Sequence, residues 1–182
     1  MKWIIASDIH GSAECCQKLL WHMKNEKADK LLLLGDILYH GPRNDLPNGW
    51  GPKSVIEQLN EISDKVISVR GNCDAEVDNA LLNFSVTDDF VRLNFDGVGI
   101  FATHGHIYGP YSPPVLNKGD ILLCGHSHIP ALEMRGDYIY MNPGSVSLPR
   151  GGSERGFILY DNGTFFFKTL DGETYRTYCI KN

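Results

Sequence analysis

Residues 121–128 have the sequence ILLCGHSH, in which an apolar run ends at a glycine and two histidines. The run 121–124 predicts a buried strand, and Gly125 permits a tight turn of the backbone where that strand stops. His126 and His128 stand two positions apart on extended chain, so their imidazoles point to the same side. Because α/β proteins usually bind ligands at strand ends, this histidine pair marks a candidate site.

Four other predicted strands end in the same way, with glycine close to a carboxylate, amide or imidazole side chain. Their apolar runs cover residues 3–7, 31–34, 66–69 and 100–103. The five strand ends together carry seven candidate metal ligands, namely Asp8, His10, Asp36, Asn72, His104, His126 and His128. Mixed nitrogen and oxygen donors are typical of sites for divalent cations of borderline softness. Any one of these residues alone is more simply a polar group in a turn, so the hypothesis depends on all seven converging.

Length and composition predict one globular domain over residues 1–182, since the chain has 182 residues and 42% of them are hydrophobic. The apolar stretch near the first residue, 3–6, is too short for a signal peptide or a membrane span. Five cysteines, with Cys15 and Cys16 adjacent, do not indicate a disulfide framework. We therefore expect a cytoplasmic protein.

The formal net charge of −5 argues against a large basic surface for nucleic acid or for acidic membranes. It does not exclude an anionic substrate. Two bound dications beside the carboxylates of Asp8 and Asp36 would leave roughly +2 at the site, because the charge of a bound ion dominates its surroundings. The charge of the whole chain and the charge of the site can therefore differ in sign.

The first half of the chain alternates strands with helices. Ser12 is expected to cap one helix, Pro52 to open a second, and Asp74 to cap a short third helix that ends near Leu82. Strands joined by helices imply right-handed crossovers and parallel pairing. The second half instead contains dipeptides typical of hairpin turns, at Asp96-Gly97, Gly136-Asp137 and Asn162-Gly163. Together the two halves predict a mixed α/β domain.

Two segments beside the expected ligands supply candidate substrate contacts. A long loop rich in proline and glycine follows Asp36, and its Arg43 and Asn44 are candidates for contact with a substrate phosphate, because a guanidinium pairs with two phosphate oxygens at once. Against this, an arginine on a polar loop is more often simply solvated. His106, two positions beyond His104, either hydrogen-bonds a ligand or substrate, or is only packed there.

Six stretches in chain order are similar to the calcineurin-like metallophosphoesterases and, more narrowly, to the small bacterial phosphodiesterases of the YfcE type. They are ASDIHGS, LLGDILYHGPRN, VRGNCD, THGH, GHSHIP and NPGSVSLPR. The resemblance extends over nearly the whole chain. It implies an α/β fold, a four-layer αββα sandwich of two mixed β-sheets flanked by helices.

The resemblance also implies a hydrolytic site with two divalent ions. One ion would be held by Asp8, His10, Asp36 and His128, and the other by Asp36, Asn72, His104 and His126. Asp36 would bridge them, and Asp36, Asn72 and His104 would take part in catalysis. A hydroxide shared by the two ions would attack a small phosphate diester. Mn²⁺ is the ion expected from the resemblance, while Zn²⁺, Fe²⁺, Ni²⁺, Co²⁺ and Mg²⁺ stay open.

Cys73 differs from the residue that the resemblance to the wider superfamily leads us to expect at this position, and the difference affects the chemistry. The residue after Gly-Asn is often a histidine in the wider superfamily, where it protonates the leaving group or binds phosphoryl oxygens. A thiol with an ordinary pKa near 8.5 is a poorer proton donor and a weaker hydrogen-bonding group. We therefore expect either a bias toward diesters with good leaving groups, such as aryl phosphodiesters, or protonation of the leaving group by another group or by water. We count Cys73 among the candidate substrate contacts. Phosphodiesterases of the YfcE type carry the same GNCD stretch.

Two alternatives to a phosphodiesterase stay open. A phosphomonoesterase would use the same site and differ only in how the pocket treats the second substituent on phosphorus. A protein-binding scaffold is the other, since the retromer subunit of this fold has lost key ligands. The retention of His10 and His128 here favours the enzyme. The sequence decides neither the physiological substrate nor whether the chain forms a homo-oligomer.

Overall fold

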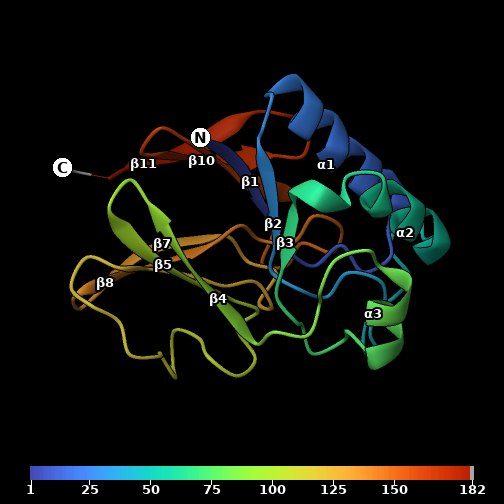
Figure 1. The fold of residues 1–182 in the computed structure, drawn as a ribbon, viewed down its shortest axis with the longest axis horizontal. Coiled ribbons are helices and arrows are strands. Elements are labelled where there is room, and N and C mark those ends of the chain that lie inside the picture. Colours follow the sequence, from blue (N-terminus) through green and yellow to red (C-terminus); the bar gives the residue numbers. More distant parts are fainter. Residues whose placement is uncertain (181–182) are drawn as a thin grey trace.

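The computed structural model describes residues 1–180 and consists of two β-sheets with a few helices (Figure 1). The first sheet contains β1 (Lys2–Ala6), β2 (Lys30–Leu33), β3 (Val66–Ser68), β9 (Gly156–Asp161), β10 (Thr164–Thr169) and β11 (Thr174–Cys179). The second contains β4 (Phe90–Phe95), β5 (Val98–Thr103), β6 (Ile121–Leu123), β7 (Ala131–Arg135) and β8 (Tyr138–Asn142). The helices are α1 (Ala13–Asn25), α2 (Pro52–Asn60) and α3 (Glu76–Leu81), with a 3-10 turn at Ser63–Lys65.

Both sheets are mixed. The first has the order β11-β10-β9-β1-β2-β3, with β1, β2 and β3 parallel and β9 antiparallel to β1. The second has the order β4-β5-β6-β8-β7, with β5, β6 and β8 parallel and antiparallel strands at both edges. The expected parallel pairing in the first half is confirmed, and so are the three expected hairpins.

The space between the sheets is filled by side chains that alternate along the strands. In β1, Trp3 and Ile5 face the second sheet, whereas Ile4 and Ala6 face the helices. Leu32 and Leu34 meet residues of β5, β6 and β8 in the same inner cluster. Side chains alternate in this way because successive residues of a strand point to opposite faces of the sheet. Both faces of the first sheet are covered at β1 and β2, so these two strands are apolar almost throughout.

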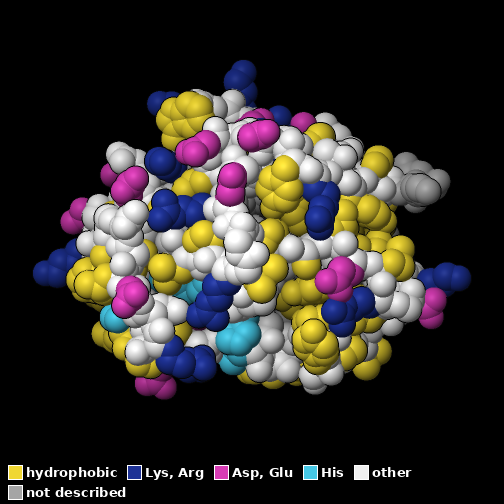
Figure 2. Space-filling model, turned by 180° about the vertical axis from the view of Figure 1, so that it is seen from behind, with side chains coloured by type: hydrophobic (Ala, Val, Ile, Leu, Met, Phe, Trp, Pro, Cys, Tyr) yellow, Lys and Arg dark blue, Asp and Glu magenta, His cyan; other side chains and the backbone are white. Residues whose placement is uncertain are grey.

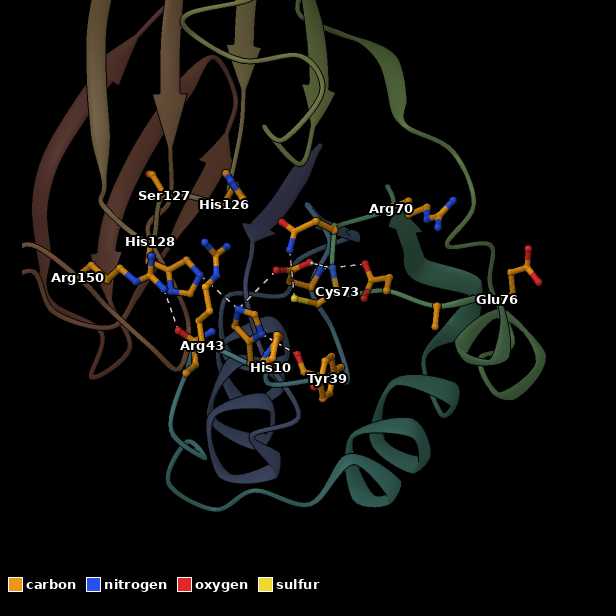
Figure 3. A pocket seen from close by; sticks show the side chains of 17 residues that line it. His10, Tyr39, Arg43, Arg70, Cys73, Glu76, His126, Ser127, His128 and Arg150 are labelled. Carbon is orange, nitrogen blue, oxygen red and sulfur yellow. Dashed lines mark hydrogen bonds and ion pairs between the residues drawn. The ribbon is translucent and has the colours of Figure 1, made fainter.

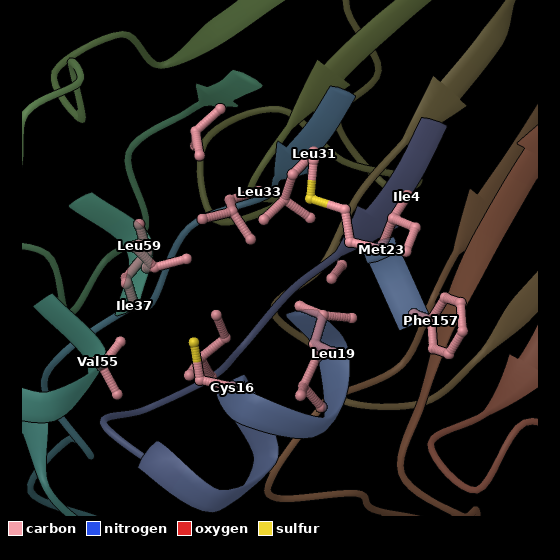
Figure 4. Close-up of a cluster of buried hydrophobic side chains, with 14 of the residues drawn as sticks. Ile4, Cys16, Leu19, Met23, Leu31, Leu33, Ile37, Val55, Leu59 and Phe157 are labelled. Atoms are coloured by element: carbon pink, nitrogen blue, oxygen red, sulfur yellow. The ribbon is translucent and has the colours of Figure 1, made fainter. Parts of the chain in front are cut away.

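Helices α1 and α2 cover the outer face of the first sheet (Figure 4). Leu19 of α1 and Leu59 of α2 pack with Leu31 and Leu33 of β2 in one buried cluster. Ser12 caps α1 as expected, since its hydroxyl oxygen accepts a hydrogen bond of 3.3 Å from the backbone N–H of Cys15.

The outer face of the second sheet is covered by the segment between β5 and β6 rather than by a helix. Tyr108 and Leu116 of this segment pack on a small buried cluster that includes Phe101, Leu122 and Tyr140. Two mixed sheets flanked by helices are nonetheless the architecture that the family resemblance implied, and that expectation is confirmed. In residues 1–180 we find no helix of the length and apolarity that crossing a membrane requires.

Candidate metal centre

All seven candidate ligands lie together where strands of both sheets end. Asp8 and His10 follow β1, and Asp36 and Asn72 follow the next two strands of the first sheet. The second sheet contributes His104 after β5, and His126 and His128 after β6. Segments more than 100 residues apart in the chain therefore meet at one place, and the buried apolar strands before them fix where each ligand starts.

One group of donors surrounds the Asp8 carboxylate. Its Oδ1 lies 3.2 Å from Nε2 of His128 and 3.6 Å from Nε2 of His10. The two imidazole Nε2 atoms are 3.3 Å apart. The Oδ2 atom of Asp36 is 3.6 Å from Nε2 of His10, so four residues present donor atoms to the same small volume.

A second group of donors lies on the other side of Asp36. Its Oδ1 atom is 3.5 Å from Nε2 of His104. That nitrogen is 3.0 Å from Oδ1 of Asn72 and 3.2 Å from Nδ1 of His126. The two oxygens of Asp36 therefore face different donor groups, which is the position that a bridging carboxylate occupies.

Backbone carbonyls set the tautomers of three histidines. The Nδ1 atoms of His10, His104 and His128 lie 2.7, 2.6 and 2.6 Å from the carbonyl oxygens of Tyr39, Leu34 and Leu148, in that order. A carbonyl only accepts hydrogen bonds, so Nδ1 carries a hydrogen and each ring turns Nε2 toward the site, where its lone pair can bind a metal ion once that nitrogen is unprotonated. Metal-binding histidines are commonly oriented in this way.

The first donor group fits a cation and little else. The lone pairs of His10 and His128 face each other across 3.3 Å, and Oδ1 of Asp8 is buried without a hydrogen-bond donor in the part of the chain described. A buried carboxylate oxygen without a partner is costly, and the atoms close to it are Nε2 of His10 and Nε2 of His128. A cation bound by these atoms would satisfy the carboxylate oxygen and both imidazole nitrogens, so the residues present suit a divalent ion.

Backbone strain is concentrated at the same residues. Asp8, His10, Asp36, His126 and His128 have φ angles of 58°, 50°, 56°, 65° and 60°. Residues other than glycine rarely adopt this left-handed region, and each such residue costs on the order of 1–3 kcal/mol. Strain that recurs at five of seven candidate ligands indicates a geometry maintained for function.

Other residues stabilise that strained geometry around Asp8. The hydroxyls of Ser145 and Ser147 donate hydrogen bonds of 2.8 and 3.0 Å to the backbone carbonyl of Asp8. The backbone N–H of His126 donates to Oδ2 of the same residue at 3.1 Å. The segment NPGSVS, one of the stretches that carry the family resemblance, thus positions the first ligand from the far end of the chain.

The electrostatics keep both carboxylates ionised. Burial opposes ionisation of Asp8, but the imidazoles of His10 and His128 hold its pKa well below the usual range. The pKa of Asp36 is likewise lowered by His104 against the effect of burial. Burial alone would lower the pKa of His104, yet Asp36 and Asp8 raise it to about 9. The metal-free site therefore holds a proton on His104, where a metal ion would replace it.

Asp74 has a role that the sequence did not predict. Its carboxylate accepts backbone N–H hydrogen bonds of 2.8, 2.8 and 2.7 Å from Asp36, Ile37 and Gly71. It thereby joins the loops that follow β2 and β3. The expectation that Asp74 caps a helix is wrong, because its oxygens are committed to these loops and α3 begins only after Ala75.

A cavity of about 830 Å³ opens over the ligands. Arg43, Asn44 and Cys73, three of the candidate substrate contacts, line it (Figure 3). His106 does not line this cavity, and its ring instead packs edge to face against His104 at 5.3 Å between centroids. Further residues that line the cavity and that sequence reasoning did not single out include Glu76 and Arg150. Arg70 also lines it; it was expected to form an ion pair that holds its loop, and in residues 1–180 no carboxylate oxygen lies within 4.0 Å of its guanidinium nitrogens. The only sequence signal for Arg150 was its place at the end of NPGSVSLPR.

Cys73 sits at the centre of this cavity. A hydrogen bond of 2.8 Å from its backbone N–H to Oδ1 of Asp36 fixes its position, and Nδ2 of Asn72 lies 3.2 Å from its sulfur. The sulfur is within 4.8 Å of donor atoms of His10 and Asp36. Burial and the negative charge of Asp36 raise the pKa of the thiol to about 12, so it stays protonated at neutral pH in the metal-free chain.

A two-sheet sandwich whose strand ends bring aspartate, asparagine and histidine donors together is the architecture of the metallophosphoesterases. Residues 1–164 match the family model of the calcineurin-like phosphoesterase superfamily domain. The chain therefore belongs to the calcineurin-like phosphoesterase superfamily.

Within that superfamily the chain is 47% identical over 174 residues to phosphodiesterase YfcE of Escherichia coli strain K12, covering 96% of this chain and 95% of that protein. A solved structure of YfcE, described as a phosphoesterase from E. coli, superposes with a TM-score of 0.96 and 43% identity over 100% of both chains. Vps29 from Entamoeba histolytica, solved with Zn²⁺, superposes with a TM-score of 0.65 at 18% identity over 100% of both chains. This last likeness shows the fold alone.

Proposed function

We propose that the chain is a metal-dependent phosphodiesterase that binds two divalent cations and hydrolyses small phosphate diesters. The observation that carries the proposal is the placement of Asp36, whose two oxygens lie 3.6 and 3.5 Å from histidine nitrogens of different donor groups. The 47% identity to a phosphodiesterase over nearly the whole chain supports the same activity.

The chain's own residues divide into two ligand sets. Asp8, His10, Asp36 and His128 would hold one ion, and Asp36, Asn72, His104 and His126 the other. When bound, two divalent ions supply Lewis-acid activation of a shared water to hydroxide and neutralise charge on the phosphate. Asp36 lies between the two sets and Asn72 lines the cavity. Nε2 of the buried His104 contacts both, at 3.5 Å from Oδ1 of Asp36 and 3.0 Å from Oδ1 of Asn72, which is why these three are proposed to act in catalysis.

Manganese is the ion that we propose, following the family resemblance. Imidazole, carboxylate and amide donors also suit Zn²⁺, Fe²⁺, Ni²⁺, Co²⁺ and Mg²⁺, so metal identity has to be measured. We also propose a cytoplasmic location. All five cysteines are free in the structure, as a reducing compartment would keep them.

The test is hydrolysis after chelation and re-addition of single metals, using bis(p-nitrophenyl) phosphate as diester and p-nitrophenyl phosphate as monoester. We expect Mn²⁺ to restore turnover of the diester and D36N to reduce it by at least about a hundredfold. Thermal unfolding of D36N without metal checks that this variant folds. Equal diester rates for D36N and the parent would reject the two-metal mechanism.

The same panel distinguishes the two alternatives. Faster turnover of the monoester would indicate a phosphomonoesterase on the same site. Metal binding measured by calorimetry without hydrolysis of either ester would favour a non-catalytic scaffold. The retained imidazoles of His10 and His128 weigh against the scaffold, since a site that only binds protein has no use for strained, buried metal donors.

A further inference from the structure

The cavity over the metal ligands differs in charge between its two ends. Arg43 and Arg150 lie beside His128 at one end, while Arg70 and Glu76 lie beyond Cys73 at the other (Figure 3). On the face shown in Figure 2, histidine side chains are visible between side chains of lysine and arginine. One end therefore carries two guanidinium groups, and the other carries charges of both signs.

Arg150 is held in position on both sides. Its backbone N–H donates a hydrogen bond of 3.1 Å to the carbonyl of His128, whose Nδ1 in turn donates to the carbonyl of Leu148 at 2.6 Å. Its Nη2 donates to Oδ1 of Asn44 at 2.8 Å, and Nδ2 of Asn44 donates to the carbonyl of His40 at 2.7 Å. The guanidinium is thus fixed relative to a candidate metal ligand before any substrate binds.

Neither guanidinium is neutralised by the protein. In residues 1–180 no carboxylate lies within 4.0 Å of Arg43 or Arg150, and Arg43 has no hydrogen-bond partner for its side chain there. A guanidinium presents several N–H donors in one plane, in a geometry that matches two oxygens of a carboxylate or phosphate. Asn44 accepts a hydrogen bond from Nη2 of Arg150 and leaves other N–H groups of this guanidinium available. Both side chains therefore keep donors free toward the cavity.

The reacting groups do not supply the missing negative charge. Two dications with the carboxylates of Asp8 and Asp36 leave roughly +2, and the single charge of a diester together with an attacking hydroxide offsets about that amount. The arginine pair adds roughly +2 more at one end of the cavity. Both arginines are exposed, so water solvates their charge in the free protein, and an anion beyond the reacting phosphate would meet an attractive potential at this end of the cavity.

We propose that Arg43 and Arg150 bind a second anionic group, a carboxylate or a further phosphate, on the substituent of the diester that does not leave. This inference rests on the proposed phosphodiesterase function and narrows its substrates to diesters with one negatively charged substituent. Asn44 acts as a positioning residue, because it orients the guanidinium of Arg150 without facing the substrate charge itself.

The experiment uses two p-nitrophenyl phosphodiesters that differ only in whether the second substituent ends in a carboxylate or in a carboxamide. We expect KM for the carboxylate ester to be about tenfold lower in the parent protein, as one charge-assisted pair provides. R150Q and R43Q should each reduce this ratio severalfold. R176Q is the control, since it removes the same charge from the exposed strand β11, remote from the cavity residues.

Binding is measured separately with phosphonate analogues that carry the same two substituents and cannot be hydrolysed. Calorimetry on the manganese-loaded protein should show the carboxylate analogue binding about tenfold more tightly, with the preference lost in R150Q and reduced in N44A. Equal affinity and equal KM for the two ligands in the parent would overturn the inference even if both esters were hydrolysed. Hydrolysis of neither ester, with the binding preference intact, would overturn the proposed function and leave the anion site standing.

Discussion

Cys73 is the residue at which this chain departs from the wider superfamily, and its environment explains what the departure does. Burial and the charge of Asp36 raise the pKa of the thiol to about 12 in the metal-free chain, and a thiol is a weaker hydrogen-bonding group and a poorer proton donor to an alkoxide leaving group than an imidazole is at neutral pH. The hydrogen bonds around it hold the sulfur in the cavity, within 4.8 Å of donor atoms of Asp36 and His10.

We predict that C73H speeds hydrolysis of diesters with poor leaving groups by about 10–100-fold and that of bis(p-nitrophenyl) phosphate much less. An imidazole is a far better proton donor at neutral pH, and only poor leaving groups need one. The measurement is kcat against leaving-group pKa, with C73S as the matched control. An unchanged slope in C73H would contradict this account of Cys73.

Asp74 is not one of the candidate metal ligands, yet its hydrogen bonds position the loops that carry two of them, Asp36 and Asn72. One carboxylate accepts hydrogen bonds from three backbone N–H groups, one of them from Asp36, the proposed bridging ligand, and another from Gly71. Its own pKa is raised because burial outweighs these hydrogen bonds. An amide in its place would turn an NH₂ group toward one or two of the same donors.

We predict that D74N lowers the free energy of unfolding by about 2–4 kcal/mol and weakens metal binding by about 10–100-fold. Denaturant unfolding and metal titration measure the two effects. D78N is the control, because within residues 1–180 the Asp78 carboxylate accepts just one hydrogen bond, from the backbone N–H of Ala75 before α3. If D78N weakens metal binding as much as D74N, the positioning role of Asp74 is wrong.

At the scale of the elements, the site is produced by strands that end in tight turns against one another. Gly125 follows β6, and a Cβ atom there would overlap Oγ of Ser7 and lie 2.9 Å from Oδ2 of Asp8. This glycine is required by close approach of the two sheets and not by its backbone angles, since its φ is not positive. The histidines that follow it therefore depend on the absence of a side chain.

We predict that G125A destabilises the chain by about 2–4 kcal/mol and abolishes metal binding at micromolar concentrations, because β1 and β6 must separate to admit the methyl group. G51A is the control, because a Cβ atom at Gly51 would lie 3.6 Å from Cβ of Ala13, an ordinary van der Waals contact. Unfolding by denaturant and metal titration give both quantities. A G125A variant that binds metal like the parent would show that the strand ends adjust more easily than this packing suggests.

The elements themselves were largely predictable from sequence, whereas contacts between distant loops were not. Apolar runs ending in glycine located the five strands with their ligands, and turn dipeptides located the hairpins, since both signals are local. Asp74 and Arg150 act through partners on other segments, and the hydrogen bond between Asn44 and Arg150 spans 106 residues of sequence. Periodicity and spacing carry no information on such pairs, and so Arg150 was missed and Asp74 was misassigned.

At the scale of the whole molecule, the candidate ligands join the two sheets. Asp8, His10, Asp36 and Asn72 extend from the first sheet, while His104, His126 and His128 extend from the second. Ions bound between these ligands would link the two sheets at the strand ends, where the buried apolar cluster between the sheets stops. Metal binding should therefore stabilise the fold as a whole and not only the loops.

We predict that saturating Mn²⁺ raises Tm of the metal-free chain by roughly 5–10 °C at a hundred times its Kd, since binding at that excess adds about 2.7 kcal/mol. The shift should grow as pH rises from 6 toward 9. His104 has a pKa of about 9 in the metal-free state, and below that pH the ion has to displace its proton. Scanning calorimetry with and without metal at several pH values measures the shift.

D36N should lose most of this shift in Tm, whereas D171N, which removes an equal charge from an exposed side chain, should keep it. A shift in D36N equal to that of the parent would mean that the ions bind elsewhere and do not join the sheets through the carboxylate between them.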